Sequence, residues 1–246
     1  IINILKMSNL NINNFFILIL FFNMFSYGQK TESEPMNIVW ISCEDMGPIL
    51  SAYKNPAIKT PNIDRIASEG VRYTNAYSTV GVCAPSRFSI ITGMYPATLG
   101  TQHMRAYKNS AANNEINSHN SLPYYSAKPK KSVRFFTEEL RANGYYCSNN
   151  SKEDYNMAAS PLAWDESNKT AHWRNREDGQ PFFSVFNFNV THESNIWKNK
   201  ASYSKEELEN VLVPSFYPDD DGIKSDLLTN YKNIEKLDKQ IGEIIE

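Results

Sequence analysis

Short apolar runs alternate with amphipathic stretches along most of the chain. The runs at 37–42, 145–147 and 181–188 are rich in Ile, Val, Phe and Tyr, and each predicts a buried β-strand. The stretch 71–77 predicts a further strand, whereas the polar stretch 109–120 predicts a surface loop. Strands that alternate with helices indicate an α/β fold built on one sheet.

Four stretches predict the helices. The stretch 60–70 begins with Thr as N-cap and Pro in the first helical position, and it ends at Gly. The stretch 85–93 also runs from Pro to Gly, so Cys83 is expected at or just before a helix N-terminus. The stretch 132–143 predicts an amphipathic helix, and 224–246 carries an apolar period typical of a longer one.

The N-terminal residues predict a targeting segment. An apolar run at 15–22 is followed by small residues near 26–28, which is typical of a cleaved secretory signal. The run is too short to span a bilayer comfortably, and no cysteine follows it that could carry a lipid. We therefore expect upstream residues and a signal peptide at 1–28, a linker at 29–36, and a secreted or periplasmic protein without a stable membrane anchor. A buried core helix is the alternative for the apolar run.

Composition narrows the function class. The 246 residues carry a formal net charge of -2 and are 41% hydrophobic, which is enough apolar material for one sizeable core. No field of basic charge favours nucleic acid as a partner. The three cysteines are an odd number for an exported protein. Cys43 and Cys147 either pair or pack as small core residues, and we favour the core.

One motif carries most of the functional signal. Cys83-Ala-Pro-Ser-Arg87 is followed by Thr92-Gly93, and this spacing resembles the signature of the formylglycine-dependent (type I) sulfatases. The resemblance extends over most of 37–246 and is nearest to N-sulfoglucosamine sulfohydrolase-like and bacterial polysaccharide sulfatases. It implies an alkaline-phosphatase-like fold, a mixed sheet flanked by helices, and hydrolysis of sulfate esters or N-sulfate on a sulfated carbohydrate.

The resemblance also implies a modified residue. In this family the motif cysteine, here Cys83, is oxidised to formylglycine by a formylglycine-generating or an anaerobic sulfatase-maturating enzyme. The hydrated aldehyde attacks sulfur and later collapses to release sulfate, which is nucleophilic catalysis with a self-releasing intermediate. A helix N-terminus beside Cys83 would favour the anionic nucleophile and the sulfate oxygens.

An acidic pair predicts a metal site. Glu44 and Asp45 follow the first predicted strand, and ligands in α/β sheets bind at the carboxyl ends of strands. Carboxylates suit a hard cation, Ca²⁺ or Mg²⁺. By resemblance, Glu44, Asp45 and Cys83 are the expected metal ligands, although the family usually has Asp in place of Glu44. Taken alone, such a pair is more often a solvated loop.

Three further residues match family positions of the catalytic site. Arg87 matches the arginine that steadies the formylglycine, Lys152 resembles the lysine that contacts sulfate, and His192 resembles the histidine that binds sulfate or protonates the leaving oxygen. Asp154 stands where many members have a histidine. The alternatives are a solvent-facing lysine and a structural histidine. His103 and Arg105 are candidate substrate residues, or they belong to a surface turn.

The family completes its metal site from a segment that follows a helix resembling 231–246. We therefore expect this chain to be the N-terminal part of a catalytic domain and to be inactive or poorly folded by itself. Two other functions stay open, namely a phosphonate or phosphate ester hydrolase of the same fold and a non-catalytic module that binds sulfated glycans. Activity on sulfate esters compared with phosphate esters separates the first of these from a sulfatase.

Overall fold

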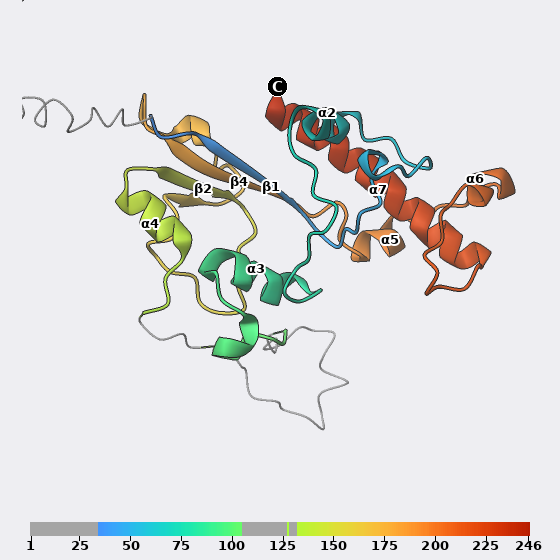
Figure 1. Cartoon of the computed structure of the whole chain (residues 1–246), viewed down its shortest axis with the longest axis horizontal. Helices are drawn as coiled ribbons and strands as arrows, with labels where there is room; N and C mark the ends of the chain where they lie inside the picture. The colour runs from blue at the N-terminus through green and yellow to red at the C-terminus, as the bar shows by residue number, and fades with distance from the viewer. Residues whose placement is uncertain (1–33, 105–126, 128–131) are drawn as a thin grey trace, which may run out of the picture. The chain divides into compact units, whose positions relative to one another are not determined.

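The computed structural model describes residues 34–104, 127 and 132–246 (Figure 1). One compact unit comprises Met36–Glu246. The predicted signal peptide, the predicted loop at 109–120 and Arg105 lie outside the described residues. None of the described helices is both long enough and apolar enough to cross a membrane.

A four-stranded sheet forms the centre of the unit, with the strand order β1-β4-β2-β3. The strands are β1 (Ile38–Cys43), β2 (Tyr146–Asn150), β3 (Glu166–Ser167) and β4 (Phe182–Phe188). All of the described pairings are parallel. The carboxyl ends of β1, β2 and β4 therefore meet at one edge of the sheet, and the polar residues that follow each strand are brought together there.

Helices α3 (Cys83–Thr92) and α4 (Phe136–Ala142) lie on one side of the sheet (Figure 1). The ring of Phe136 meets Phe183 of β4 edge-on, with the ring centroids 5.3 Å apart. Ile91 and Phe135 are almost fully buried in a cluster of apolar side chains beneath the sheet. This packing fixes α3, and with it Cys83, relative to the strand ends.

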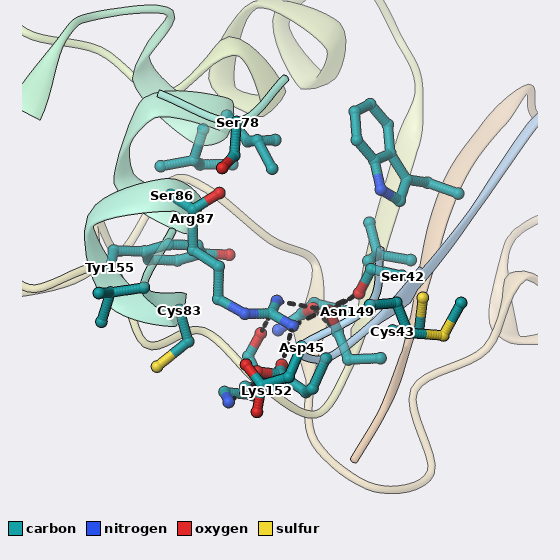
Figure 2. A pocket seen from close by; sticks show the side chains of 18 of the residues that line it. Ser42, Cys43, Asp45, Ser78, Cys83, Ser86, Arg87, Asn149, Lys152 and Tyr155 are labelled. Carbon is teal, nitrogen blue, oxygen red and sulfur yellow. Dashed lines mark hydrogen bonds and ion pairs between the residues drawn. The ribbon is translucent and has the colours of Figure 1, made fainter. Parts of the chain in front are cut away.

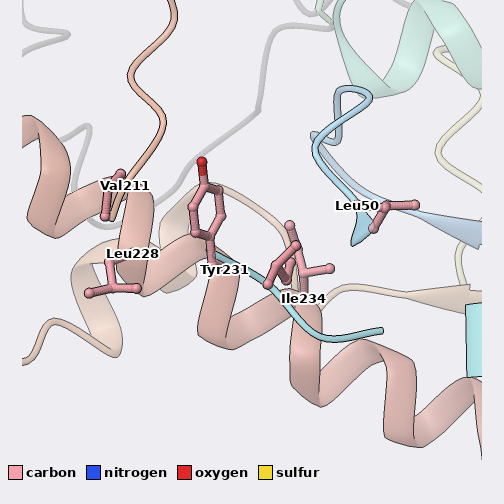
Figure 3. Packing of buried hydrophobic residues seen from close by; sticks show 6 residues of the cluster. Leu50, Val211, Leu228, Tyr231 and Ile234 are labelled. Carbon is pink, nitrogen blue, oxygen red and sulfur yellow. The ribbon is translucent and has the colours of Figure 1, made fainter. Parts of the chain in front are cut away.

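A second apolar cluster is built around the long helix α7 (Asp221–Ile245) (Figure 3). Leu228, Tyr231 and Ile234 of α7 belong to it together with Leu50 and Val211. The predicted 3.6-residue period of this stretch is thereby confirmed, although the helix begins three residues before the predicted start at 224. The other helices of the described residues are α2 (Pro61–Glu69), α5 (Ser194–Lys198), α6 (Lys205–Glu209) and the short 3₁₀ turns η1 (Ser51–Tyr53), η2 (Pro96–Leu99) and η4 (Trp173–Asn175).

The buried carboxylate of Asp238 joins α7 to the N-terminus of α2. Its Oδ1 accepts from the backbone N–H of Ile63 at 2.9 Å, and its Oδ2 accepts from the Asn62 side-chain amide at 2.9 Å. Thr60 occupies the predicted N-cap position, but its hydroxyl makes no capping bond and instead lies 2.5 Å from Ser51 Oγ. The acceptor for the first turn of α2 therefore comes from a residue far away in the sequence.

Several sequence predictions differ from the structure. The stretch 71–77 forms no strand and is exposed throughout. Helix α4 begins at Phe136 rather than near 132, and α3 begins at Cys83, two residues before the expected start. Cys147 is fully buried, as expected for a core residue, but Cys43 is exposed. The three cysteines are free thiols, so the alternative of a Cys43–Cys147 disulfide is not observed.

Candidate active site

A pocket of about 640 Å³ lies where the carboxyl ends of β1, β2 and β4 meet the first turn of α3 (Figure 2). Cys83 is the first residue of α3, and Arg87 follows one turn later on the same helix. Glu44 directly follows β1, and Lys152 follows β2 after a single intervening residue. All four of these predicted site residues line the pocket.

The carboxylate of Glu44 is the centre of an ion-pair cluster. The residue is 3% exposed, and its Oε1 lies 2.6 Å from Arg87 Nη2 and 3.0 Å from Lys152 Nζ. Burial raises the pKa of Glu44, but the hydrogen bonds and charges of Arg87 and Lys152 outweigh burial and hold the pKa below its usual value. Glu44 is therefore ionised at neutral pH, and the two cations converge on one wall of the pocket.

Arg87 is held in place by an amide that sequence reasoning missed. Its Nη1 donates to Asn187 Oδ1 at 2.7 Å, and the same oxygen accepts from Ser42 Oγ at 2.7 Å. The amide nitrogen of Asn187 donates in turn to Asn149 Oδ1 at 2.8 Å. Asn187 thus connects α3 to three strands. Its only signal in the sequence is that it interrupts an apolar run with a polar side chain.

The thiol of Cys83 is partly buried beside these charges. Burial raises its pKa, and the nearby carboxylate of Asp154 adds to the increase by its charge and by a hydrogen bond. The charge of Lys152 and the backbone at Ala84 act in the opposite direction but do not cancel the shift. The unmodified side chain is therefore a neutral thiol at neutral pH, which is a weak nucleophile.

Hydrogen bonds connect the segment after β4 to the acidic pair. The hydroxyl of Thr191 accepts from the backbone N–H of Glu44 at 3.1 Å and donates to its carbonyl at 2.7 Å. Asp45 is exposed, and its Oδ2 accepts from the backbone N–H of Glu193 at 2.9 Å. The ring of His192 contacts Ser194 within its own turn, and it is Glu193, rather than His192, that lines the pocket.

One of the two predicted substrate residues, His103, does not line this pocket, and its carbonyl accepts from the side chain of Asn156. Asn156 also donates to the carbonyl of Thr101 at 2.7 Å, so the two bonds fix the backbone of this loop. Because Arg105 is outside the described residues, its role stays a prediction.

The predicted metal site fits a hard cation in the type of its donors but not in their number. Glu44 and Asp45 supply carboxylate oxygens, which Ca²⁺ and Mg²⁺ prefer. Within the described part of the chain, however, no group of three or more His, Cys, Asp or Glu side chains is arranged to hold a metal ion. One oxygen of Glu44, Oε1, is already bonded to both Arg87 and Lys152.

The family model and the most similar proteins all indicate the same family. A family model described as Sulfatase matches residues 36–246. An ulvan-active sulfatase of Formosa agariphila is 40% identical over 248 residues, which cover 87% of this chain and 40% of that protein. An N-acetylgalactosamine-6-O-sulfatase of Bacteroides thetaiotaomicron is 48% identical over 65 residues, covering 26% of this chain and 13% of that protein.

Solved structures share the fold. The yidJ protein of Bacteroides fragilis superposes with a TM-score of 0.60 at 17% identity, covering 89% of this chain and 59% of that chain. A 2-O GAG sulfatase gives a TM-score of 0.58 at 15% identity, covering 85% of this chain and 53% of that chain. The chain thus spans about 40% of the first curated relative and somewhat more than half of these solved structures.

Proposed function

The chain belongs to the sulfatase family, and we propose that it acts in the removal of sulfate from a sulfated sugar or polysaccharide through a nucleophile made at Cys83. The substrate class is supported by relatives that are named for ulvan and for the 6-O-sulfate of N-acetylgalactosamine. Such a reaction is a sulfuric ester hydrolysis. The sugar, the linkage and the choice between O-sulfate and N-sulfate are left open by these names.

One observation carries the proposal. Cys83 begins a helix and faces a pocket whose wall holds two cationic side chains, Arg87 and Lys152, around one buried carboxylate. The N-terminus of α3 adds N–H groups that favour negative charge at the same place. A sulfate group carries negative charge on several oxygens, so this pocket suits it. In the same pocket, burial and the carboxylate of Asp154 raise the pKa of the Cys83 thiol, so the unmodified side chain would be a weak nucleophile.

We expect Cys83 to be converted to formylglycine by a maturating enzyme. At this position formylglycine would supply a hydrated aldehyde, one hydroxyl of which attacks sulfur as the sugar oxygen leaves, and its collapse to the aldehyde then releases sulfate. The rest of the site has to bind the sulfate, orient it and move protons. Asp154, which contacts the side chain of Cys83, stands at the position where many family members have a histidine.

The chain's own residues divide this work. Arg87 is anchored by Glu44 and Asn187, so its guanidinium is a fixed positive charge beside Cys83 rather than one that is free to rotate. Lys152 is a point charge on a flexible arm, and it can turn from Glu44 toward an incoming sulfate oxygen. His192 is proposed to protonate the leaving oxygen, which requires its ring to turn away from Ser194.

We also propose a divalent cation, Ca²⁺ or Mg²⁺, held by Glu44, Asp45 and position 83. Such an ion would polarise the sulfate oxygens as a Lewis acid. Glu44 would coordinate it either through Oε2 or by giving up one of the contacts that Oε1 makes with Arg87 and Lys152. His103 and Arg105 are proposed to contact more distant parts of the carbohydrate. The apolar N-terminal segment supports export to the periplasm or the medium.

Mass spectrometry of the peptide that contains Cys83, prepared from protein isolated from its native host, tests the proposal. Formylglycine is lighter than cysteine, so the modified peptide is expected at the lower mass, while the peptide with Cys147 keeps its thiol. As part of a whole sulfatase domain, the matured chain is expected to hydrolyse an aryl sulfate in preference to an aryl phosphate, and the Cys83→Ala variant of that protein is expected to lose this activity. An unmodified thiol at position 83 in active protein would refute the mechanism.

A further inference from the structure

Four polar side chains, one from each strand of the sheet, are joined by hydrogen bonds near the carboxyl ends of the strands. The hydroxyl of Ser42 in β1 donates to Asn187 Oδ1 in β4 at 2.7 Å. The amide nitrogen of Asn187 donates to Asn149 Oδ1 in β2 at 2.8 Å, and that of Asn149 donates to Ser167 Oγ in β3 at 3.0 Å. The bonds follow the order of the strands in the sheet, and we call these four residues the amide ladder.

The amide ladder has a fixed direction. At its far end the hydroxyl of Ser167 donates to Glu153 Oε1 at 2.5 Å, and an ionised carboxylate can only accept. Because the Ser167 proton is used in this way, its oxygen accepts from the amide nitrogen of Asn149. The oxygen of Asn149 then faces Asn187, so both amides have their nitrogen toward β3 and their oxygen toward β1.

The oxygen end of the ladder holds Arg87 (Figure 2). Asn187 Oδ1 accepts from Arg87 Nη1 at 2.7 Å, in addition to the bond from Ser42, while the amide nitrogen also donates to the carbonyl of Asn150 at 3.1 Å. The amide of Asn187 thus makes two bonds through its oxygen and two through its nitrogen. A guanidinium has only donors, so an amide turned the other way would set its nitrogen against Arg87.

Asn187 fixes the guanidinium without adding charge. Arg87 already has one charged acceptor, because its Nη2 lies 2.6 Å from Glu44 Oε1. The two cations of the site, Arg87 and Lys152, contact two carboxylates, those of Glu44 and Asp154. A further carboxylate at position 187 would make the sum of these charges negative and disfavour an anionic substrate. A neutral acceptor avoids this.

We propose that Asn187, oriented by the amide ladder, is a positioning residue for the proposed reaction, and that it holds the Arg87 guanidinium beside position 83 while leaving its positive charge uncancelled. The inference rests on the proposed function and deepens it. Asn187 lies directly opposite Ser42 in the register of β4 and β1. The sheet, rather than a loop, therefore sets where the guanidinium is held.

The charge beside position 83 is measurable on the unmatured full chain, in which Cys83 is a thiol. Iodoacetate is an anion and iodoacetamide is neutral, but both alkylate the same thiolate. The ratio of the two rate constants therefore cancels the accessibility and the pKa of the thiol, and it reports the local positive charge. Mass spectrometry of the peptide that contains Cys83 gives both rate constants separately from those of Cys43 and Cys147, which are also free thiols.

A double-mutant cycle tests whether Asn187 acts through Arg87. Asn187→Leu keeps the size of the side chain but removes the acceptor, so the guanidinium is no longer fixed beside Cys83. The iodoacetate-to-iodoacetamide ratio is expected to fall about threefold, and Arg87→Met is expected to lower it at least as much. In the Arg87→Met background, Asn187→Leu should have no further effect. An unchanged ratio in Asn187→Leu, or an equal fall with and without Arg87, would overturn the proposal.

Two control variants accompany the cycle. Asn189→Leu makes the same substitution two residues later, at an exposed position that does not line the pocket, and it is expected to leave the ratio unchanged. Asn187→Ala removes the same acceptor with a smaller side chain, and it is expected to match Asn187→Leu even if leucine packs poorly. Urea denaturation verifies that each variant is folded. An equal fall of the ratio in Asn189→Leu would contradict a specific role for Asn187.

Asn187→Asp tests why the acceptor is neutral. The carboxylate still accepts from Arg87 but adds a negative charge, so the ratio at Cys83 is expected to fall further than in Asn187→Leu. This fall should persist in the Arg87→Met background, because it does not depend on where the guanidinium lies. A ratio equal to that of the unchanged chain would show that the neutrality of Asn187 has no effect on the site.

The link to catalysis is measured separately, in a whole sulfatase domain that contains the matured chain. Asn187→Leu is expected to lower kcat for an aryl sulfate at least about tenfold per formylglycine formed, with KM changed less than about threefold, because a misplaced guanidinium stabilises the transition state less well. If the alkylation cycle behaves as expected but the unchanged domain does not hydrolyse sulfate esters, only the proposed function fails. If the domain is active and Asn187→Leu is equally active, Asn187 is not a positioning residue.

Discussion

Two carboxylates, those of Glu44 and Asp238, are deeply buried in the described part of the chain, and they have different kinds of hydrogen-bond partners. Glu44 lies in the pocket between the side-chain cations of Arg87 and Lys152. Asp238 lies between two helices and accepts hydrogen bonds from the backbone and side chain of Asn62 and from the backbone of Ile63. Side-chain cations can exchange partners, whereas backbone N–H groups are fixed by the helix. The first arrangement suits a site that must take up an anion, and the second suits a rigid joint.

The largest effect that would test this comparison is expected at the joint. Asp238→Ala leaves the partly buried N–H groups of Asn62 and Ile63 without their acceptor, so the free energy of unfolding should fall by about 3 kcal/mol. Urea denaturation of the full chain measures the change. Asp226→Ala is the control on the same helix: Asp226 is half exposed and lies 3.7 Å from Lys200, so its loss should cost less than about 0.5 kcal/mol. Equal costs for the two variants would contradict a special role for Asp238.

The isosteric pair Asp238→Asn and Glu44→Gln compares the two regions directly. The side-chain amide of Asp238→Asn keeps one acceptor oxygen, but its NH₂ group faces the N–H donors of Asn62 and Ile63. The free energy of unfolding should therefore fall by about 2 kcal/mol. Glu44→Gln should cost less than about 1 kcal/mol, because Arg87 keeps Asn187 and Lys152 can turn to Asp154 or water. In protein from the native host, Glu44→Gln should nevertheless lower aryl sulfate turnover at least about 100-fold. A stability loss at 44 as large as that at 238 would remove the distinction.

A smaller effect is expected at Gly242, where α7 lies against Asn62 of α2. A Cβ atom added at Gly242 would lie 2.9 Å from the side-chain amide of Asn62, which is bonded to Asp238. Gly242→Ala should therefore destabilise the chain by about 1 kcal/mol, even though alanine favours helix by a similar amount. Gly222→Ala is the comparison, because the nearest atom there belongs to the exposed side chain of Asp220. If Gly242→Ala stabilised the chain, the helices would not be in the close contact described.

The smallest effect concerns pH. The folded-state pKa of Glu44 lies below its usual value of 4.5, since the cations outweigh the effect of burial. The stabilisation that results is fully present above the unfolded-state pKa and is lost as the pH falls through the lowered folded-state value. Chemical denaturation at neutral pH and at successively lower pH should show this loss in the unchanged chain. The loss should be smaller in Glu44→Gln, and an identical pH profile for the two proteins would argue against an ionised Glu44 in the cluster.

Much of the fold was predictable because local pattern and tertiary environment agree. The apolar runs at β1, β2 and β4 are strands, and the period that begins near 224 is helical. The prediction of a strand at Val71–Tyr77 was wrong. A strand requires a neighbouring strand to pair with, and an alternating sequence pattern alone does not supply one. The cap of α2 was missed for a related reason. Thr60 has the right residue type, but the acceptor is Asp238, whose position depends on how two helices pack.

The candidate site was likewise predictable in part, and the residues that were missed depend on tertiary packing. Glu44, Cys83, Arg87 and Lys152 were assigned to one site chiefly because they match positions of the sulfatase family, and the structure brings them to one pocket. Their catalytic and metal-binding roles stay proposals. Asn187 was missed because its importance comes from the register of β1, β4 and β2, which places it beside Ser42 and Asn149. His192 lies after β4 as expected, but its ring contacts Ser194 rather than the pocket.

Cys83 and Arg87 lie one turn apart on a single helix whose next turns are locked under the sheet by Phe88 and Ile91. The spacing between the reacting position and its guanidinium is therefore set by helix geometry, and it survives any shift of the surrounding loops. Loops around the pocket can be lengthened or replaced without loosening this pair. Such a division allows one rigid pair of side chains to be kept behind pocket entrances of different shapes.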